Sequence, residues 1–230
     1  MITAAQRATI DAVVSVLETG KLPSPAAYGT VAILADGAGL SYGKHQATAA
    51  STLPALLAEY DRRNGLYAGR IRPYLPLLAS TCSLTSESQA SEAVQILIAV
   101  LRAAGADPVM QQVQDDLFDR EYWIPATTYA SNIGLCTALS HLCVYDLAIQ
   151  SGPTRIDKLR PMFPAAPPSR GGDEAEWTRQ LVRARREWLA GHPTEAVRRS
   201  VYRCDQLLGL ITAGKWHLTR PFVVLGVRIA

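Results

Sequence analysis

Apolar residues recur at helical spacing along most of the chain. Ile10 and Leu17 lie on the apolar face of a helix that this spacing predicts for residues 4–20, and Gly20 followed by two prolines predicts its end. The same spacing predicts further helices over residues 51–63, 86–104, 108–124, 128–150, 173–190 and 194–213. In the segment 128–150 apolar positions surround the whole helix, so we expect it to be central and buried.

Two segments depart from the helical pattern. Residues 28–47 are rich in Gly, Thr, Val and Ile, and they predict short strands or turns that carry the only sizeable sheet. Residues 221–229, PFVVLGVRI, predict a strand or an extended tail. The expected fold class is therefore mainly α, with a small β-element after the first helix. We expect one catalytic domain over residues 1–230, made of two helical lobes with a cleft between them.

Composition and charge narrow the class of protein. Hydrophobic residues make up 48% of the 230 residues, enough for a core, and no apolar run approaches the roughly 18 residues of a membrane span. The net charge of +3 is too small to favour nucleic acid as a partner. The first residues form an amphipathic pattern rather than a signal peptide, so we expect synthesis in the cytoplasm without general secretion. The spacing of the four histidines and four cysteines predicts no metal site, and we expect no cofactor.

Two carboxylates stand in contrasting surroundings. Glu18 ends an apolar helix beside a Gly/Pro break, where partial burial would raise its pKa and make it a proton donor. Asp36 lies in the glycine-flanked segment ADGAGLS, where water and backbone N–H groups would keep it ionised. Glycosidic bond cleavage uses a carboxyl pair whose pKa values are pushed apart in this way. Each residue taken alone is also typical of an ordinary helix end or turn.

The spacing of these two residues resembles that of the family 46 chitosanases, which belong to the lysozyme-like superfamily. In that family a glutamate at the end of the first long helix is the acid, and an aspartate in a glycine-rich turn is the base. Its two carboxylates are 18 positions apart, as are Glu18 and Asp36. The resemblance implies that Glu18 is the acid, that Asp36 is the base, and that Ser41 helps to position the attacking water. Further segments similar to the family, in the same order, are QDDLFDREYWIPA (114–126), VYDLAIQSGP (144–153) and GGDE (171–174).

The resemblance also implies residues that support the site. Asp146, Arg185 and Arg203 match a buried charge network behind the acid, and a buried aspartate does need partners such as the arginine fork. An alternative is that this trio only holds helices together. Candidate substrate-binding residues are Lys44 and His45, which are close to Asp36 in the sequence, together with Tyr42 and Arg120.

Charge favours one polysaccharide substrate over another. Chitosan is a polycation, and its hydrolases are expected to present an acidic cleft and to be exported, whereas this chain is mildly basic. We therefore expect hydrolysis of β-1,4 bonds in anionic peptidoglycan, by a muramidase of phage-lysin or secreted-effector type. It would act on the cell wall after non-classical delivery or host lysis, with an immunity protein or a fused delivery domain as further partners. The alternatives are a chitosanase and a non-catalytic glycan-binding module of the cell wall. For either hydrolase, the sequence leaves open whether the reaction inverts or retains the configuration.

Overall fold

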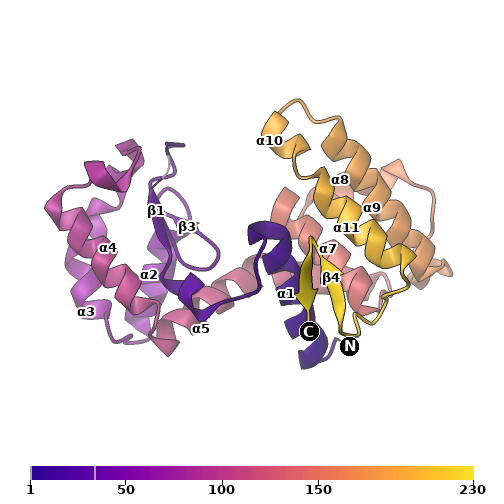
Figure 1. Cartoon of the computed structure of the whole chain (residues 1–230), viewed down its shortest axis with the longest axis horizontal. Coiled ribbons are helices and arrows are strands. Elements are labelled where there is room, and N and C mark those ends of the chain that lie inside the picture. The colour runs from indigo at the N-terminus through magenta and orange to yellow at the C-terminus, as the bar shows by residue number, and fades with distance from the viewer. Residues whose placement is uncertain (1, 34) are drawn as a thin grey trace. The chain divides into compact units, whose positions relative to one another are not determined.

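The computed structural model describes residues 2–33 and 35–230, which form two compact units. Unit 1 comprises Met1–Pro23 and Arg120–Ala230, and unit 2 comprises Ser24–Asp119. Both units are built mainly from helices, as the sequence predicts, and each carries one small antiparallel sheet (Figure 1). Within the described ranges no single helix is long and apolar enough to cross a membrane, although the bent pair Glu92–Ala104 and Pro108–Asn132 meets the criterion together.

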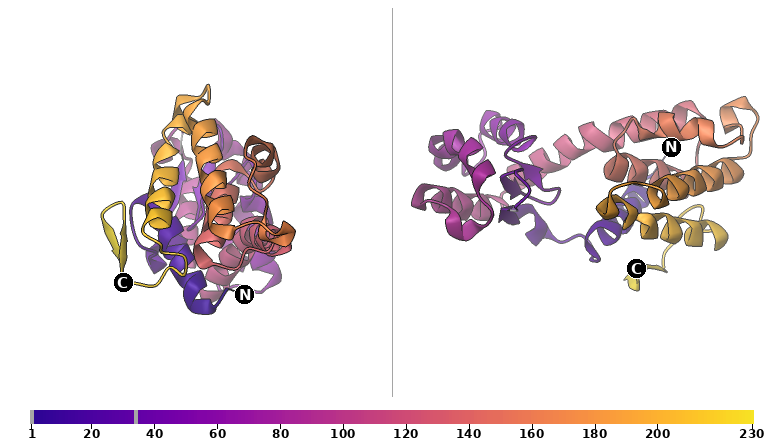
Figure 2. Two further views of the ribbon diagram at one scale, coloured as in Figure 1. Left: turned by 90° about the vertical axis from the view of Figure 1, so that its right-hand side faces the viewer. Right: turned by 90° about the horizontal axis from the view of Figure 1, so that it is seen from above.

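Unit 1 is organised around one buried helix, α7 (Ala138–Ser151). Every residue from Ala138 to Ala148 is buried, as the apolar pattern predicted for a central helix. Helices α1, α6, α8, α9 and α11 pack against it, and α9 and α11 run side by side (Figure 2). The elements that surround α7 are α1 (Ala4–Thr19), η5 (Asp119–Trp123, shared with unit 2), α6 (Ile124–Asn132), α8 (Arg155–Leu159), η6 (Arg160–Met162), η7 (Pro168–Arg170), α9 (Glu174–Ala190), α10 (Glu195–Arg198), α11 (Val201–Thr212), β4 (Phe222–Val224) and β5 (Val227–Ile229).

Unit 2 packs a three-stranded sheet against helices. The strands lie in the order β1-β2-β3, all antiparallel, and Tyr42 of β2 pairs with Val31 of β1 and Ala47 of β3. Helix α4 packs on β1, and α2 packs on β3 and α5. The elements are η1 (Pro25–Gly29), β1 (Val31–Ile33), β2 (Leu40–Tyr42), β3 (Ala47–Thr48), α2 (Leu53–Arg62), α3 (Ala68–Ile71), η2 (Arg72–Leu77), η3 (Ala79–Ser83), η4 (Glu87–Gln89), α4 (Glu92–Ala104) and α5 (Pro108–Phe118).

Local caps define both ends of α1. The Thr3 hydroxyl accepts the Gln6 N–H, and the Gln6 side chain accepts the Thr3 N–H, which completes a capping box. At the other end Gly20 adopts the left-handed conformation, with φ of 71°, and its N–H bonds to the Val16 carbonyl. The cap places Glu18 in the last turn of the helix.

The predicted helix over 86–104 is shorter than expected. Helix α4 begins after Ser91, whose side chain accepts the Val94 N–H at 3.4 Å. The residues before it form the short turn η4, and Ala90 then adopts an extended conformation that interrupts the helix. Gly105 ends α4 as predicted.

Pro125 lies in the first turn of a helix instead of following the end of one. Helix α5 stops at Phe118, the π-helical turn η5 follows, and α6 starts at Ile124. Proline is tolerated in a first turn because the N–H that it lacks has no helical partner there. The predicted end before Pro125 is therefore wrong, because the helical path continues through the π-helical turn to Asn132.

Two other predicted helices are divided by breaks. Gly134 adopts a φ of 83° after α6, and the Thr137 side chain then caps α7 at the Ser140 N–H, so 128–150 is not one helix. The segment 194–213 forms α10 and α11. Residues 221–229 form the hairpin β4–β5, so the sheet after α1 is not the only one.

Candidate active site

Glu18 lies where the end of α1 meets α11. Its Oε1 atom lies 3.3 Å from Nη1 of Arg203, and its side chain is 35% exposed. Burial of the carboxyl group raises the pKa of Glu18, the Arg203 charge opposes this rise, and the Asp146 charge adds to it; the net shift is upward. The direction agrees with the sequence-based expectation. It favours a carboxyl group that is available as a proton donor.

Behind Glu18, Asp146 on α7 binds two arginines. Its Oδ2 lies 2.7 Å from Nη1 of Arg185, and its Oδ1 lies 2.5 Å from Nη2 of Arg203. Burial opposes ionisation of Asp146, but the charges and hydrogen bonds of Arg203 and Arg185 prevail and lower its pKa. All three side chains are buried, so the structure brings together the trio that the sequence singled out. Since Arg203 also reaches Glu18, the trio adjoins the candidate acid.

Asp36 lies in an exposed turn of unit 2 between β1 and β2. Its Oδ1 accepts the Ala38 N–H at 2.9 Å, which is an Asx turn. Two glycines follow it at positions that favour glycine: Gly37 and Gly39 have φ of 77° and 74°. A side chain at Gly39 would also meet Thr81 Oγ1 at 2.7 Å. Leu34, within the predicted β-element 28–47, lies outside the described residues.

Ser41 and Tyr42 occupy β2, the central strand of the sheet. Ser41 is 5% exposed and pairs with Ala32 on one side and Thr48 on the other. Tyr42 is 0% exposed, and its hydroxyl has no hydrogen-bond partner among the described residues. The predicted substrate-binding role of Tyr42 conflicts with this burial, because a side chain without exposed surface cannot contact a polysaccharide. The role of Ser41 in positioning water stays a prediction.

Lys44 and His45 contact α5, which their closeness to Asp36 in sequence did not indicate. Lys44 Nζ lies 3.0 Å from Asp115 Oδ1, and the Tyr28 hydroxyl donates to Asp115 Oδ2 at 2.7 Å. The His45 ring stacks on Phe118 with 3.4 Å between centroids. These contacts join the turn after β2 to α5, and they engage Lys44 in an ion pair within unit 2.

Arg120 is exposed and lies in η5, where the sequence also places two aromatic residues. Trp123 lies under the Arg7 guanidinium, whose carbon is 3.8 Å from the ring centroid. Burial and nearby negative charges, Glu18 among them, raise the pKa of Tyr122. Tyr122 is therefore within electrostatic range of the candidate acid, whereas Arg120 makes no contact with Glu18 among the described residues.

One residue near Glu18 was missed by the sequence analysis. The Tyr202 hydroxyl donates to the Leu17 carbonyl oxygen at 2.5 Å, directly before the candidate acid. The only signal in the sequence was that Tyr202 precedes Arg203, a residue already singled out.

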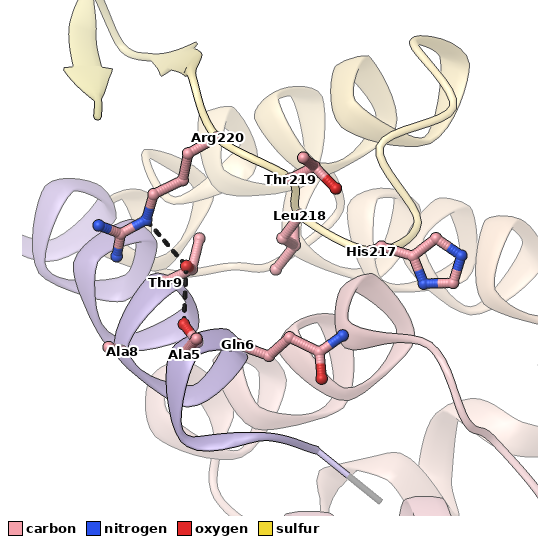
Figure 3. A pocket seen from close by; sticks show the side chains of 8 residues that line it. All are labelled: Ala5, Gln6, Ala8, Thr9, His217, Leu218, Thr219 and Arg220. Atoms are coloured by element: carbon pink, nitrogen blue, oxygen red, sulfur yellow. Dashed lines mark hydrogen bonds between the residues drawn. The ribbon is translucent and has the colours of Figure 1, made fainter.

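Unit 1 also has a pocket of about 390 Å³ between the first half of α1 and residues 217–220 (Figure 3). Its polar groups largely serve the fold: the Thr9 hydroxyl donates to the Ala5 carbonyl and accepts from Arg220 Nε. The Gln6 oxygen is held by the capping box. We therefore assign no ligand to this pocket. In residues 2–33 and 35–230, no group of three or more His, Cys, Asp or Glu is arranged to hold a metal ion.

Comparison with known sequences identifies one family. The profile of Glycosyl hydrolase family 46 matches residues 12–222. A chitosanase of Bacillus subtilis (strain 168) is 26% identical over 230 residues, which cover 95% of this chain and 81% of that protein. A chitosanase of a Streptomyces species is 34% identical over 125 residues, which cover 51% of this chain and 44% of that protein.

Solved structures give the same picture of the fold. A family 46 chitosanase of Gynuella sunshinyii, in complex with chitotetraose, matches with a TM-score of 0.76 at 27% identity, over 100% of this chain and 98% of that one. A native chitosanase of Bacillus subtilis matches with a TM-score of 0.79 at 24% identity, over 100% of both chains. The second likeness concerns the fold alone.

The expected peptidoglycan substrate is wrong, because the matching family and both related sequences favour the chitosanase alternative. The expectation rested on the net charge of +3, which combines two different units. Unit 2 has nine acidic and six basic side chains, a formal charge of −3, whereas unit 1 has 17 basic and 11 acidic ones, a charge of +6. The unit that carries Asp36 is therefore acidic. The expected immunity protein and delivery route stay predictions.

Proposed function

Because the chain belongs to glycosyl hydrolase family 46, we propose that it is a chitosanase, which hydrolyses β-1,4 bonds between glucosamine units of chitosan. Its membership of the family makes it a glycoside hydrolase. The choice of chitosan is supported by the two related sequences, both chitosanases, and by the neighbour bound to chitotetraose. The acidic character of unit 2 suits a substrate whose amino groups are positively charged.

The observation that carries the proposal is the contrast between the two carboxyl groups. Glu18 is partly buried, its pKa is raised, and Arg203 holds it at 3.3 Å. Asp36 is exposed and is oriented by the Ala38 N–H. One group is thus suited to carry a proton and the other to accept one, which is the division of roles that glycoside hydrolysis requires.

In the proposed reaction Glu18 donates its proton to the glycosidic oxygen as the bond from that oxygen to C1 breaks. A water molecule forms the new bond to C1, and Asp36 accepts the proton that this water loses. Ser41 would help to hold the water. Arg203 and Asp146 would keep the Glu18 carboxyl group in place, since Arg203 bonds to both.

The test is incubation of the purified protein with chitosan hexamer, followed by mass spectrometry of the products. We expect shorter glucosamine oligomers with new reducing ends, and no products from the Glu18→Gln variant. An intact hexamer after prolonged incubation, together with retention of the protein on chitosan beads, would instead favour a non-catalytic binding module.

A further inference from the structure

Two consecutive residues of α11 hold the end of α1. The Tyr202 hydroxyl donates to the Leu17 carbonyl oxygen at 2.5 Å, and Arg203 Nη1 lies 3.3 Å from Glu18 Oε1. One contact fixes the backbone immediately before Glu18, and the other fixes the carboxyl group itself. Both partners lie 185 positions away along the chain, so the two contacts form only when α1 and α11 are packed.

The Leu17 carbonyl belongs to the last turn of α1, where carbonyl groups lack helical partners. In a longer helix the Lys21 N–H would bond to it. Here the Lys21 N–H bonds instead to the Thr19 hydroxyl at 3.2 Å, because the chain leaves the helix at Gly20. The Tyr202 hydroxyl takes the place of the missing donor.

We propose that Tyr202 is a positioning residue for the acid: it orients the peptide between Leu17 and Glu18 so that the carboxyl group is aimed at the glycosidic oxygen. This inference rests on the proposed function, in which Glu18 is the acid. The exposure of Tyr202 supports it, since the residue is 38% exposed and therefore does not serve mainly to fill the core.

Arg203 alone would leave the acid loosely placed. It makes one contact with Glu18, at 3.3 Å, while its shorter bonds go to Asp146. Among the described residues, the Tyr202 hydroxyl is the only group from another element that bonds to the backbone of the last turn of α1. Without it, water would hydrogen-bond to the Leu17 carbonyl oxygen instead. The carboxyl group would then move relative to the bond that it protonates, a kind of misplacement that lowers turnover more than binding.

The test compares Tyr202→Phe with Thr9→Val. Both variants remove a hydroxyl group that donates to a carbonyl of α1, but Thr9 lies nine residues before Glu18, about 13 Å along the helix (Figure 3). For Tyr202→Phe we expect kcat on chitosan hexamer to fall about 10- to 100-fold with little change in KM. For Thr9→Val we expect a lower melting temperature and a kcat within about twofold of the parent, because its bonds are remote from the acid.

The second readout is the titration of the Glu18 carboxyl carbon, followed by NMR in protein labelled with ¹³C-glutamate and assigned with Glu18→Gln. Burial is the main cause of the raised pKa of Glu18, so a looser carboxyl group in Tyr202→Phe should titrate at lower pH. The alkaline limb of the kcat–pH profile should move down with it, since the acid must be protonated to act. Thr9→Val should leave both unchanged.

Three results would overturn the inference. The first is an unchanged kcat and an unchanged Glu18 titration in Tyr202→Phe, and the second is an equal fall in kcat in Thr9→Val. The third is a Tyr202→Phe variant in which KM rises while kcat stays the same. An intact chitosan hexamer after incubation with the parent protein would refute the proposed function, and full activity of Glu18→Gln would refute only the role of Glu18 as the acid. In either case the NMR titration of Tyr202→Phe still decides whether Tyr202 orients the Glu18 carboxyl group, so the failures are distinct.

Discussion

Arg203 connects Asp146 to Glu18: its Nη2 atom lies 2.5 Å from Asp146 Oδ1, and its Nη1 atom lies 3.3 Å from Glu18 Oε1. Asp146 is 0% exposed and Arg203 is 5% exposed, whereas Glu18 is partly open to solvent. A single guanidinium group therefore joins the centre of unit 1 to the candidate acid. Changes to Asp146 or Arg203 should lower both stability and catalysis, whereas changes to Glu18 should lower catalysis without lowering stability.

Replacing Asp146 by Ala should lower the free energy of unfolding by about 3–5 kcal/mol, because it leaves Arg185 and Arg203 buried without their counter-charge. Urea denaturation followed by circular dichroism measures this change. The matched control is Asp205→Ala, which breaks an exposed pair with Arg186 and should cost at most about 1 kcal/mol. Equal effects of the two substitutions would mean that the Asp146 charge contributes no more than a surface charge.

The stability that Asp146 provides should be constant near neutral pH and decrease in acid. Its folded pKa lies below the ordinary value of 3.8, so the contribution is present above 3.8 and is lost as the pH falls through the folded pKa. The difference in unfolding free energy between the parent and Asp146→Asn should therefore be constant from neutral pH down to about 4 and shrink below it. Denaturation curves measured between pH 2 and 7 test this, and a difference that grew in acid would contradict it.

Replacing Glu18 by Gln should reduce chitosan hydrolysis by at least about 10²-fold, since proton donation is lost. It should not reduce stability at neutral pH. The folded pKa of Glu18 is raised above 4.5, so ionisation of this residue opposes folding as the pH rises, and a neutral amide avoids that cost. Calorimetry should show a melting temperature at least equal to that of the parent at pH 7, with the difference vanishing below pH 4.5. Turnover within a few-fold of the parent would rule Glu18 out as the acid.

Replacing Asp36 by Asn should abolish hydrolysis while binding to chitosan persists, because the amide cannot accept a proton from water but keeps the same shape. The Asn side-chain oxygen can still accept the Ala38 N–H, so the turn should be preserved. Co-sedimentation with chitosan and a hexamer digest measure the two effects separately. Loss of both binding and hydrolysis would indicate that Asp36 mainly binds substrate amino groups.

Salt should weaken the reaction on chitosan. The formal charge of −3 on unit 2 attracts a polycation, and the screening length falls from about 10 Å at 0.1 M salt to about 3 Å at 1 M. We expect kcat/KM to fall by roughly threefold or more across this range. Partly acetylated oligomers, which carry fewer charges, provide the control and should respond less. A rise in kcat/KM with salt would indicate that the positive charge of unit 1 dominates the encounter.

Much of the fold and part of the site followed from local signals in the sequence. The apolar period and the Gly20 stop predicted α1 to within one residue and put Glu18 in its last turn. The glycines after Asp36 predicted an exposed turn, because glycine readily adopts positive φ there. These features depend on residues that are close together in sequence, so the sequence alone was sufficient for them. The order of motifs along the chain identified the family.

Other features depended on tertiary packing. The pairing of Lys44 with Asp115, 71 positions away along the chain, required knowledge of which elements lie side by side. The distribution of charge required the division into units, and the net charge alone led to the wrong substrate. Tyr202 carries no sequence motif, and its contact with Leu17 spans 185 positions. Hydrogen bonds of this kind arise only after helices pack, because packing decides which orphan carbonyl meets which donor.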